Sequence, residues 1–234
     1  MLSTYRIADL LVNMNVRYPL LQTRAQDYRL DGPSLQDCDI SIDMTDEQLK
    51  KLNNPYLGLS EYEYLAYGSR FYRQLLRFDG MMLHASAVAY QGKAYLFSAP
   101  CQTGKSTHAQ QWKSCFGPEV SIINDDKPAI RVKNGAFYAY GTPFSGKTDL
   151  NENICVPLQA ICILEQGDTN VITKISSSEA IFPLLHQTNH YLSEENMQRL
   201  LSLLDQLVRS IPIYQLRCTI SEEAARTAYE AMHG

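Results

Sequence analysis

The sequence predicts an α/β fold of mixed α+β character, in which helices flank a mixed β-sheet that contains a P-loop. A nearly continuous apolar run at residues 156–164 is typical of a central strand covered on both faces. A second apolar run, at residues 95–97, precedes a Gly-Lys-Ser-Thr segment at residues 104–107. This is the order of a strand, a phosphate-binding loop and a helix.

Residues 1–78 are expected to form an N-terminal extension or small lid subdomain, and residues 79–234 the P-loop domain. The chain has 234 residues, 45% of them hydrophobic, which suffices for one large core or for a core plus a small extension. Residues 7–16 fit either a strand pair or a helix. Alternation over residues 34–44 indicates a strand.

Two helices are predicted in this first part. A cap at Thr45, followed by two acidic residues, begins a short helix that runs to Leu52. A longer helix is predicted over residues 60–76. Its expected apolar face comprises Tyr64, Leu65, Phe71, Leu75 and Leu76.

A strand is predicted over residues 82–90, turning back through residues 91–93 into the strand that leads to the loop. His84 is therefore expected on a strand paired with the one that carries the loop. A single histidine in a strand is usually a satisfied structural residue. Beside carboxylates, however, it becomes a candidate proton partner.

The Gly-Lys-Ser-Thr segment is the candidate phosphate site. Backbone N–H groups at a helix N-terminus point at an anion, Lys105 can span two phosphates, and the Ser106 hydroxyl can ligate Mg²⁺. Ala99 stands where such loops have their first glycine, and Gln102 also lacks the freedom of glycine, so we expect a narrower or differently turned loop. We expect the thiol of Cys101, inside this loop, to be reactive.

A short strand over residues 120–124 delivers the pair Asp125 and Asp126 at its carboxyl end. Phosphoryl transfer needs one carboxylate near Mg²⁺ and one within reach of the attacking hydroxyl. The alternative is a solvated Asp-Asp turn before Pro128. The preceding strand and the spacing from Lys105 favour the first interpretation.

Three segments in this order resemble the catalytic domain of the HPr kinase/phosphorylase family: Leu-His-Ala-Ser at 83–86, Ala-Pro-Cys-Gln-Thr-Gly-Lys-Ser-Thr at 99–107 and Ile-Asn-Asp-Asp-Lys-Pro at 123–128. That family is similar in fold to the phosphoenolpyruvate carboxykinases, and the resemblance covers roughly residues 80–165. It implies ATP and Mg²⁺ as ligands and a serine-like hydroxyl as acceptor. By the same resemblance Lys105 is the phosphate lysine and Ser106 is a metal ligand. Asp125 is then the metal carboxylate and Asp126 the base, assisted by His84, although the sequence also allows these two roles to be exchanged, because successive strand residues point to opposite faces.

The chain departs from that family in the loop, at Cys101 and Gln102, and after the double Asp. Where the family has a Glu-x-x-Arg-Gly-like segment, this chain has a strand over residues 136–140 and then a tight, glycine-containing loop. Lys147 in that loop is placed to neutralise a phosphate or an acidic acceptor, or is a solvated turn residue. The candidate ligand-binding residues are Cys101, Gln102, Thr103, Gly104, Lys105, Ser106, Thr107 and Lys147.

The remaining elements complete the layered domain. A capping box at 176–179 begins a helix through Leu185, and Ser193 begins another. A strand over residues 213–217 and a helix from Ser221 follow. The second helix is expected to bury Leu200, Leu201, Leu204 and Leu207.

Composition narrows the function classes. A net charge of −4 without a Lys/Arg cluster argues against nucleic-acid binding. No apolar run approaches the roughly 20 residues of a membrane span, and the start lacks a signal-peptide pattern, so a cytoplasmic protein is expected. The six cysteines show no metal-ligand spacing. The oligomeric state is left open, a homo-oligomer included.

The sequence therefore favours a kinase that moves a nucleotide phosphoryl group to a hydroxyl on a peptide, protein or small molecule. The expected catalytic residues are His84, Lys105, Asp125 and Asp126. A non-catalytic nucleotide-sensing or partner-binding module is the alternative. A carboxykinase-like enzyme is the minority interpretation and would need a basic pocket, for which Arg131 and Lys147 are the only candidates.

Overall fold

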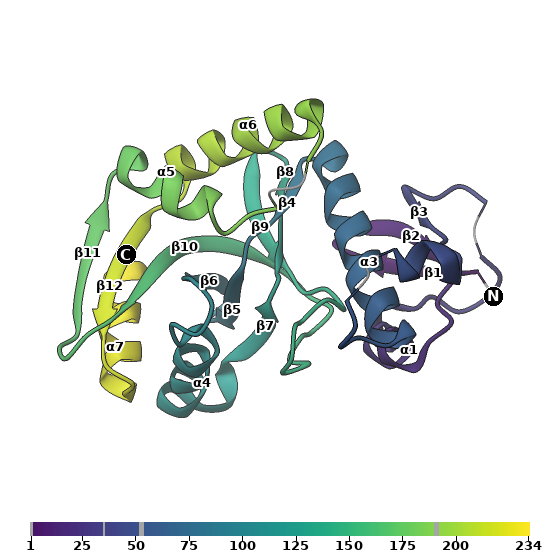
Figure 1. Ribbon diagram of the computed structural model, residues 1–234. Helices are drawn as coiled ribbons and strands as arrows, with labels where there is room; N and C mark the ends of the chain where they lie inside the picture. Colours follow the sequence, from purple (N-terminus) through teal and green to yellow (C-terminus); the bar gives the residue numbers. More distant parts are fainter. Residues whose placement is uncertain (1, 35, 52–53, 190–191) are drawn as a thin grey trace.

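The computed structural model describes residues 2–34, 36–51, 54–189 and 192–234 and contains two β-sheets (Figure 1). A three-stranded sheet comes from the N-terminal residues and a nine-stranded mixed sheet from the rest of the described chain. Helix α3 stands between them (Figure 1). The mixture of strands and helices confirms the predicted α/β class with a mixed sheet.

The small sheet begins with a hairpin of β1 (Ser3–Ile7) and β2 (Leu10–Met14), joined by two residues in left-handed conformation, Ala8 and Asp9. Positive φ at both central residues is the type I′ geometry that matches the strand twist. Of the two alternatives left open for residues 7–16, the strand pair is therefore correct. Strand β3 (Ile40–Ile42) adds parallel to β2 and is shorter than the predicted 34–44 strand.

Three helical segments surround this sheet. They are α1 (Pro19–Arg24), the 3-10 turn η1 (Gln26–Tyr28) and α2 (Asp46–Lys50). The predicted cap at Thr45 is confirmed, because its side chain accepts from the N–H of Gln48 in a capping box. Leu52, where that helix was expected to end, lies outside the described residues.

Helix α3 (Leu59–Leu75) confirms the long helix predicted over residues 60–76, and the turn η2 (Leu76–Phe78) follows it. Phe71 and Leu75 on its expected apolar face are completely buried. The assignment of Leu65 to that buried face is wrong, because Leu65 is 42% exposed and lines two cavities. Helical spacing placed Leu65 beside Tyr64, but the described residues cover its side chain only in part.

The nine-stranded sheet has the order β4-β8-β9-β10-β6-β5-β7, with β12 joined to β10 and β11 to β12. Strand β10 is central because it is antiparallel to β9 and parallel to both β6 and β12. The strands are β4 (Gly80–Met82), β5 (Ala85–Tyr90), β6 (Lys93–Ser98), β7 (Ser121–Asp126), β8 (Ala129–Lys133), β9 (Ala136–Tyr140), β10 (Cys155–Gln166), β11 (Val171–Ile175) and β12 (Ile213–Cys218).

Helices cover both faces of this sheet (Figure 1). On one face α4 (Lys105–Phe116), followed by the turn η3 (Gly117–Glu119), packs with α7 (Glu222–Met232) in one hydrophobic cluster. On the other face lie α5 (Ser177–Leu185) and α6 (Glu194–Ser210). The coverage of β10 on both faces is confirmed, since Ile161 and Cys162 belong to opposite clusters.

Two sequence predictions about packing and pairing need correction. Leu201 was expected to be buried by α6 but is 42% exposed, because it lies off the stripe that packs on the sheet. His84 does not lie on a strand: the predicted strand 82–90 is divided, with Leu83 and His84 linking β4 to β5. The division arises because β4 pairs with β8, whereas β5 pairs with β6 and β7.

The N-terminal residues share a core with the large sheet. Phe144, from the loop after β9, lies in the hydrophobic cluster of the first 78 residues. Its ring centroid is 5.8 Å from that of Phe71 and 5.7 Å from that of Tyr72. Within the described residues, no helix is long and apolar enough to span a bilayer.

Candidate active site

The register of three strands brings the predicted site residues to one edge of the sheet. Ala85 is the partner of both Ser98, at the end of β6, and Asp126, at the end of β7. Since neighbouring strands lie about 4.8 Å apart, the start of the loop and the second aspartate are about 10 Å apart. His84 directly precedes Ala85, so it lies between the two.

A cavity of about 740 Å³ opens at this edge. Every predicted site residue except Thr103 lines it. Side chains of the N-terminal residues, which the sequence did not assign to the site, close its other side. The lining residues are Leu20, Arg24, Leu57, Glu61, Tyr64, Leu65, His84, Cys101, Gln102, Gly104, Lys105, Ser106, Thr107, Asp125, Asp126, Lys127, Gly146, Lys147 and Thr148.

The predicted phosphate loop connects the end of β6 to the first turn of α4. Gly104, directly before the helix, has φ 109°, a conformation that suits glycine. Gln102 has φ 66°, so a non-glycine residue takes a left-handed conformation in the loop. Ser106 and Thr107 are exposed at the first turn of the helix.

The ammonium group of Lys105 is folded back on this loop. Its Nζ donates to the carbonyl oxygen of Ala99 at 2.9 Å and to that of Pro100 at 3.2 Å. Burial lowers the pKa of Lys105, against the opposing charges of Asp126, Cys101 and Asp125. To contact a phosphate, the Lys105 ammonium would therefore have to exchange these two carbonyl oxygens for phosphate oxygens.

Asp126 is the centre of an ion-pair cluster. Its Oδ1 lies 3.0 Å from His84 Nε2 and its Oδ2 lies 2.7 Å from Lys127 Nζ. Burial by itself raises the pKa of Asp126, but the hydrogen bond from His84 and the charge of Lys127 outweigh it and hold the pKa well below its usual range. Asp126 therefore carries a negative charge in the cavity.

Gln187, directly after the turn that ends α5, positions His84. The backbone N–H of His84 donates to the backbone oxygen of Gln187 at 2.7 Å. The ring nitrogen Nδ1 of His84 lies 2.9 Å from the side-chain oxygen Oε1 of Gln187. Together with the contact between Nε2 and Asp126, this places a polar partner at each ring nitrogen of His84 and fixes the orientation of the ring. Sequence reasoning missed Gln187, because no local pattern marks a glutamine that orients a residue 103 positions away.

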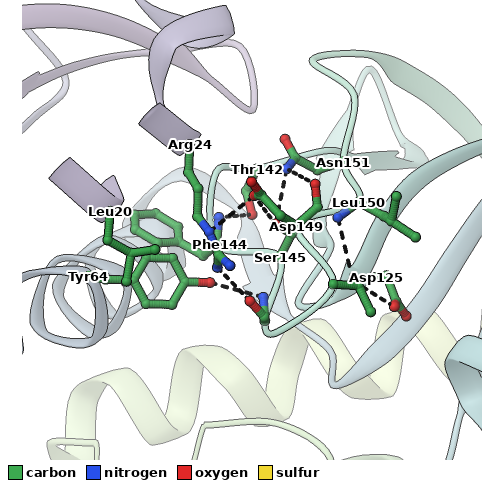
Figure 2. A network of polar contacts seen from close by, with 12 residues as sticks. Leu20, Arg24, Tyr64, Asp125, Thr142, Phe144, Ser145, Asp149, Leu150 and Asn151 are labelled. Carbon is green, nitrogen blue, oxygen red and sulfur yellow. Dashed lines mark hydrogen bonds and ion pairs between the residues drawn. The ribbon is translucent and has the colours of Figure 1, made fainter. Parts of the chain in front are cut away.

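Asp125 is 2% exposed, and hydroxyl groups hold both of its oxygens. Ser86 donates to Oδ1, and Thr148 donates to Oδ2 at 2.9 Å. Its backbone N–H donates to the Leu150 oxygen at 2.9 Å (Figure 2). Over the described residues, Asp125 forms no ion pair within 4.0 Å. A buried carboxylate with only neutral donors is short of positive charge.

The loop between β9 and β10 is held over the site by N-terminal side chains (Figure 2). Arg24 contacts Asp149 at 3.1 Å, donates to the Gly146 oxygen and lies over the Tyr64 ring at 4.7 Å. The Gly146 N–H donates to the Tyr64 hydroxyl at 2.9 Å. A Cβ at Gly146 would lie 2.6 Å from the Asp126 Cβ, so only glycine allows this approach. The glycines in the sequence of this loop predicted a tight turn, but they did not predict the contacts with Arg24 and Tyr64.

A second cavity, of about 410 Å³, lies on the other side of the predicted phosphate loop. Gln102, Gly104 and Thr107 line both cavities, and Thr103 lines only this one. Its far wall is formed at the carboxyl ends of two strands, by residues 164–167 at the end of β10 and residues 218–220 at the end of β12. The loop therefore separates the 740 Å³ cavity from the 410 Å³ cavity at the same end of the sheet.

Comparisons with known proteins give structural neighbours, one of which is described here, and one family. The structure is similar to the Hpr(Ser) kinase/phosphatase from Coxiella burnetii, with a TM-score of 0.38 and 10% identity over 65% of this chain and 99% of that one. Similarity at this level does not extend to activity. A search of curated proteins found no match. Residues 64–225 match the family described as SynChlorMet cassette protein ScmC. Because this match spans more than half of the chain, the protein belongs to the ScmC family.

Proposed function

We propose that this protein is a nucleotide-dependent phosphotransferase that moves the terminal phosphoryl group of ATP, or of a similar nucleotide, to a hydroxyl acceptor. One observation carries the proposal: the loop with Lys105 and the paired His84 and Asp126 line the same 740 Å³ cavity. A helix N-terminus, a lysine and a carboxylate across a shared space are the groups that phosphoryl transfer uses.

The two adjoining cavities support one orientation of the nucleotide. The phosphates would lie over Gly104 and Lys105, because backbone N–H groups at a helix N-terminus bind anions. The Lys105 ammonium would exchange its two loop carbonyl oxygens for phosphate oxygens. The 410 Å³ cavity, between the loop and the ends of β10 and β12, has room for the nucleoside. The terminal phosphate then points into the larger cavity, toward Asp126.

The residues present fit a magnesium ion that arrives with the nucleotide. Asp125 is a buried carboxylate without a cationic partner in the described chain, and the Ser106 hydroxyl is exposed at the helix start. Mg²⁺ is usually held by one or two carboxylates together with substrate phosphates. Bound there by Ser106 and Asp125, it would neutralise charge on the phosphate oxygens.

The reaction breaks the bond between the terminal phosphorus and the leaving diphosphate and forms a bond from phosphorus to the acceptor oxygen. The acceptor hydroxyl loses its proton, which Asp126 can accept and pass to solvent through His84. The lowered pKa of Asp126 makes it a weak base. A loose transition state needs a positioned acceptor more than a strong base, so orienting the hydroxyl is the main task of this carboxylate.

A nucleotide-binding module without turnover is the second candidate, and the loop geometry favours it. Gln102 takes a left-handed conformation, and Lys105 is already satisfied by two loop carbonyls. A carboxykinase is not proposed. Arg131, which that reaction would need in a basic pocket, donates to the backbone oxygens of Ala8 and Phe78 and does not line the cavity.

The test is incubation of the protein with γ-labelled ATP and Mg²⁺, with and without cell extract, followed by separation of labelled products. The proposal expects label in inorganic phosphate or in an acceptor. Bound ATP that stays intact under all conditions would support the binding module instead. Failure to bind ATP at all would overturn both candidates.

A further inference from the structure

An apolar recess of about 170 Å³ lies beside the cavity, between α3 and the loop after β9. Its walls are formed chiefly by Tyr64, Leu65, Tyr72, Met82 and Phe144. Apart from Leu65 and Met82, these are buried aromatic residues. The ring of Phe144 contacts two tyrosine rings. Its centroid lies 5.9 Å from that of Tyr64 and 5.7 Å from that of Tyr72. The recess therefore has walls that cannot easily collapse.

The recess is continuous with the reacting centre. Tyr64, Leu65 and Lys127 line both it and the large cavity. Lys127 Nζ lies 2.7 Å from Asp126 Oδ2, so the recess opens next to the carboxylate that faces the acceptor hydroxyl. Among the described residues, it shares no lining residue with the 410 Å³ cavity on the other side of the predicted phosphate loop.

The two tyrosine hydroxyls at the recess already have partners. The Tyr72 hydroxyl contacts the Lys127 oxygen and the Thr142 hydroxyl, and the Tyr64 hydroxyl accepts from the Gly146 N–H. Ser69 and Asn189 add polar side chains to the lining, and the rest of the surface that the recess offers to a ligand is mainly apolar. Leu65, 42% exposed, leaves part of that surface uncovered. A cavity of about 150 Å³ with apolar walls is known to hold benzene, which sets the size of group that fits.

We propose that this recess binds an apolar group of the acceptor, a ring or a branched aliphatic chain adjacent to the hydroxyl that receives the phosphoryl group. The inference rests on the proposed phosphotransferase function and names its substrate class. It places the acceptor side group beside the reacting centre, in a recess separate from the cavity proposed for the nucleoside. It also gives the N-terminal residues a role, since α3 supplies one wall.

Binding is tested first, without turnover. The probe is benzyl alcohol, which joins a hydroxyl to a ring, and glycerol is the hydroxyl-only control. In protein with labelled leucine methyl groups, benzyl alcohol should shift the Leu65 signal saturably and leave Leu201 unchanged; Leu201 has the same 42% exposure on α6. Glycerol should shift neither signal. A Ser69→Trp variant fills the recess and should abolish the Leu65 shift. An unmoved Leu65 signal, or equal shifts at both leucines, overturns the inference.

Transfer is tested second, with acetyl-Ser-Leu-amide and acetyl-Ser-Gly-amide as acceptors and γ-labelled ATP as donor. We expect kcat/KM to be roughly tenfold higher for the leucine compound, close to the value of burying about two methylene-sized groups. Leu65→Ala should reduce this preference severalfold, and Leu201→Ala should keep it. Transfer without any preference overturns the inference and leaves the phosphotransferase proposal standing. A Leu65 shift with no transfer to any acceptor shows that the recess binds an apolar group but overturns the phosphotransferase proposal, and with it the assignment of that group to an acceptor.

Discussion

Replacement of Lys105 by methionine should weaken nucleotide binding by ten- to a hundredfold. A charge-assisted hydrogen bond contributes about 1.5–3 kcal/mol, and each 1.4 kcal/mol is a factor of about ten. The exchange that binding requires limits the effect. Nζ must leave the oxygens of Ala99, at 2.9 Å, and Pro100, at 3.2 Å, before it contacts phosphate.

The same substitution should change folding stability little. Lys105 is 7% exposed, and burial lowers its pKa, so the folded protein disfavours the charge that methionine removes. Against this, two carbonyl oxygens lose a donor at about 1 kcal/mol each. We expect these contributions to offset each other to within about 1 kcal/mol.

Calorimetric titration with Mg-ATP measures the binding effect, and Lys113→Met on the same helix is the matched control. Lys113 is exposed in the last turn of α4 and does not line the cavity. The control should bind like the wild type. Equal affinity of Lys105→Met and wild type would remove this loop from the nucleotide site.

Three further predictions concern other groups around the loop. Asp125→Asn should reduce about tenfold the factor by which Mg²⁺ strengthens ATP binding in calorimetry, because the buried charge is lost; an unchanged factor would place the ion elsewhere. Saturating nucleotide should slow alkylation of Cys101 but not of Cys155, which is also exposed but lies at the start of β10; equal rates with and without nucleotide would count against the site. Burial lowers the pKa of His108 to about 4. The unfolded chain takes up this proton near pH 6.5, so stability is full above that pH and falls as pH drops toward about 4, by up to about 3 kcal/mol. Urea unfolding at several pH values measures this loss, and His108→Gln should reduce it.

The sequence predicted the parts of the site that are local. A strand followed by a glycine and a lysine indicated the loop, and a strand ending in two aspartates indicated β7. Both predictions depend on neighbouring residues alone. The hairpin between β5 and β6 was also predictable, because Gln91 and Gly92 form a two-residue turn with positive φ.

The parts that the sequence missed depend on contacts between distant segments. Arg24 reaches Gly146 over 122 positions, and Gln187 orients His84 over 103. The break at His84 likewise follows from pairing with two different sets of strands, which a run of alternating apolar residues does not encode. Leu65 was misassigned for a related reason: helical spacing identifies a face but not whether another element covers it.

The measurement that tests the account most directly is single-turnover transfer from γ-labelled ATP by the wild type and by Asp126→Asn. Asparagine keeps the shape of Asp126 but removes the charge that pairs with His84 and Lys127. With ATP bound beforehand, we predict ATP affinity within about threefold of the wild type and transfer slower by about two to four orders of magnitude. Equal transfer rates in the two proteins, or intact ATP in the wild type at saturation, would contradict the assignment of phosphoryl transfer to this site.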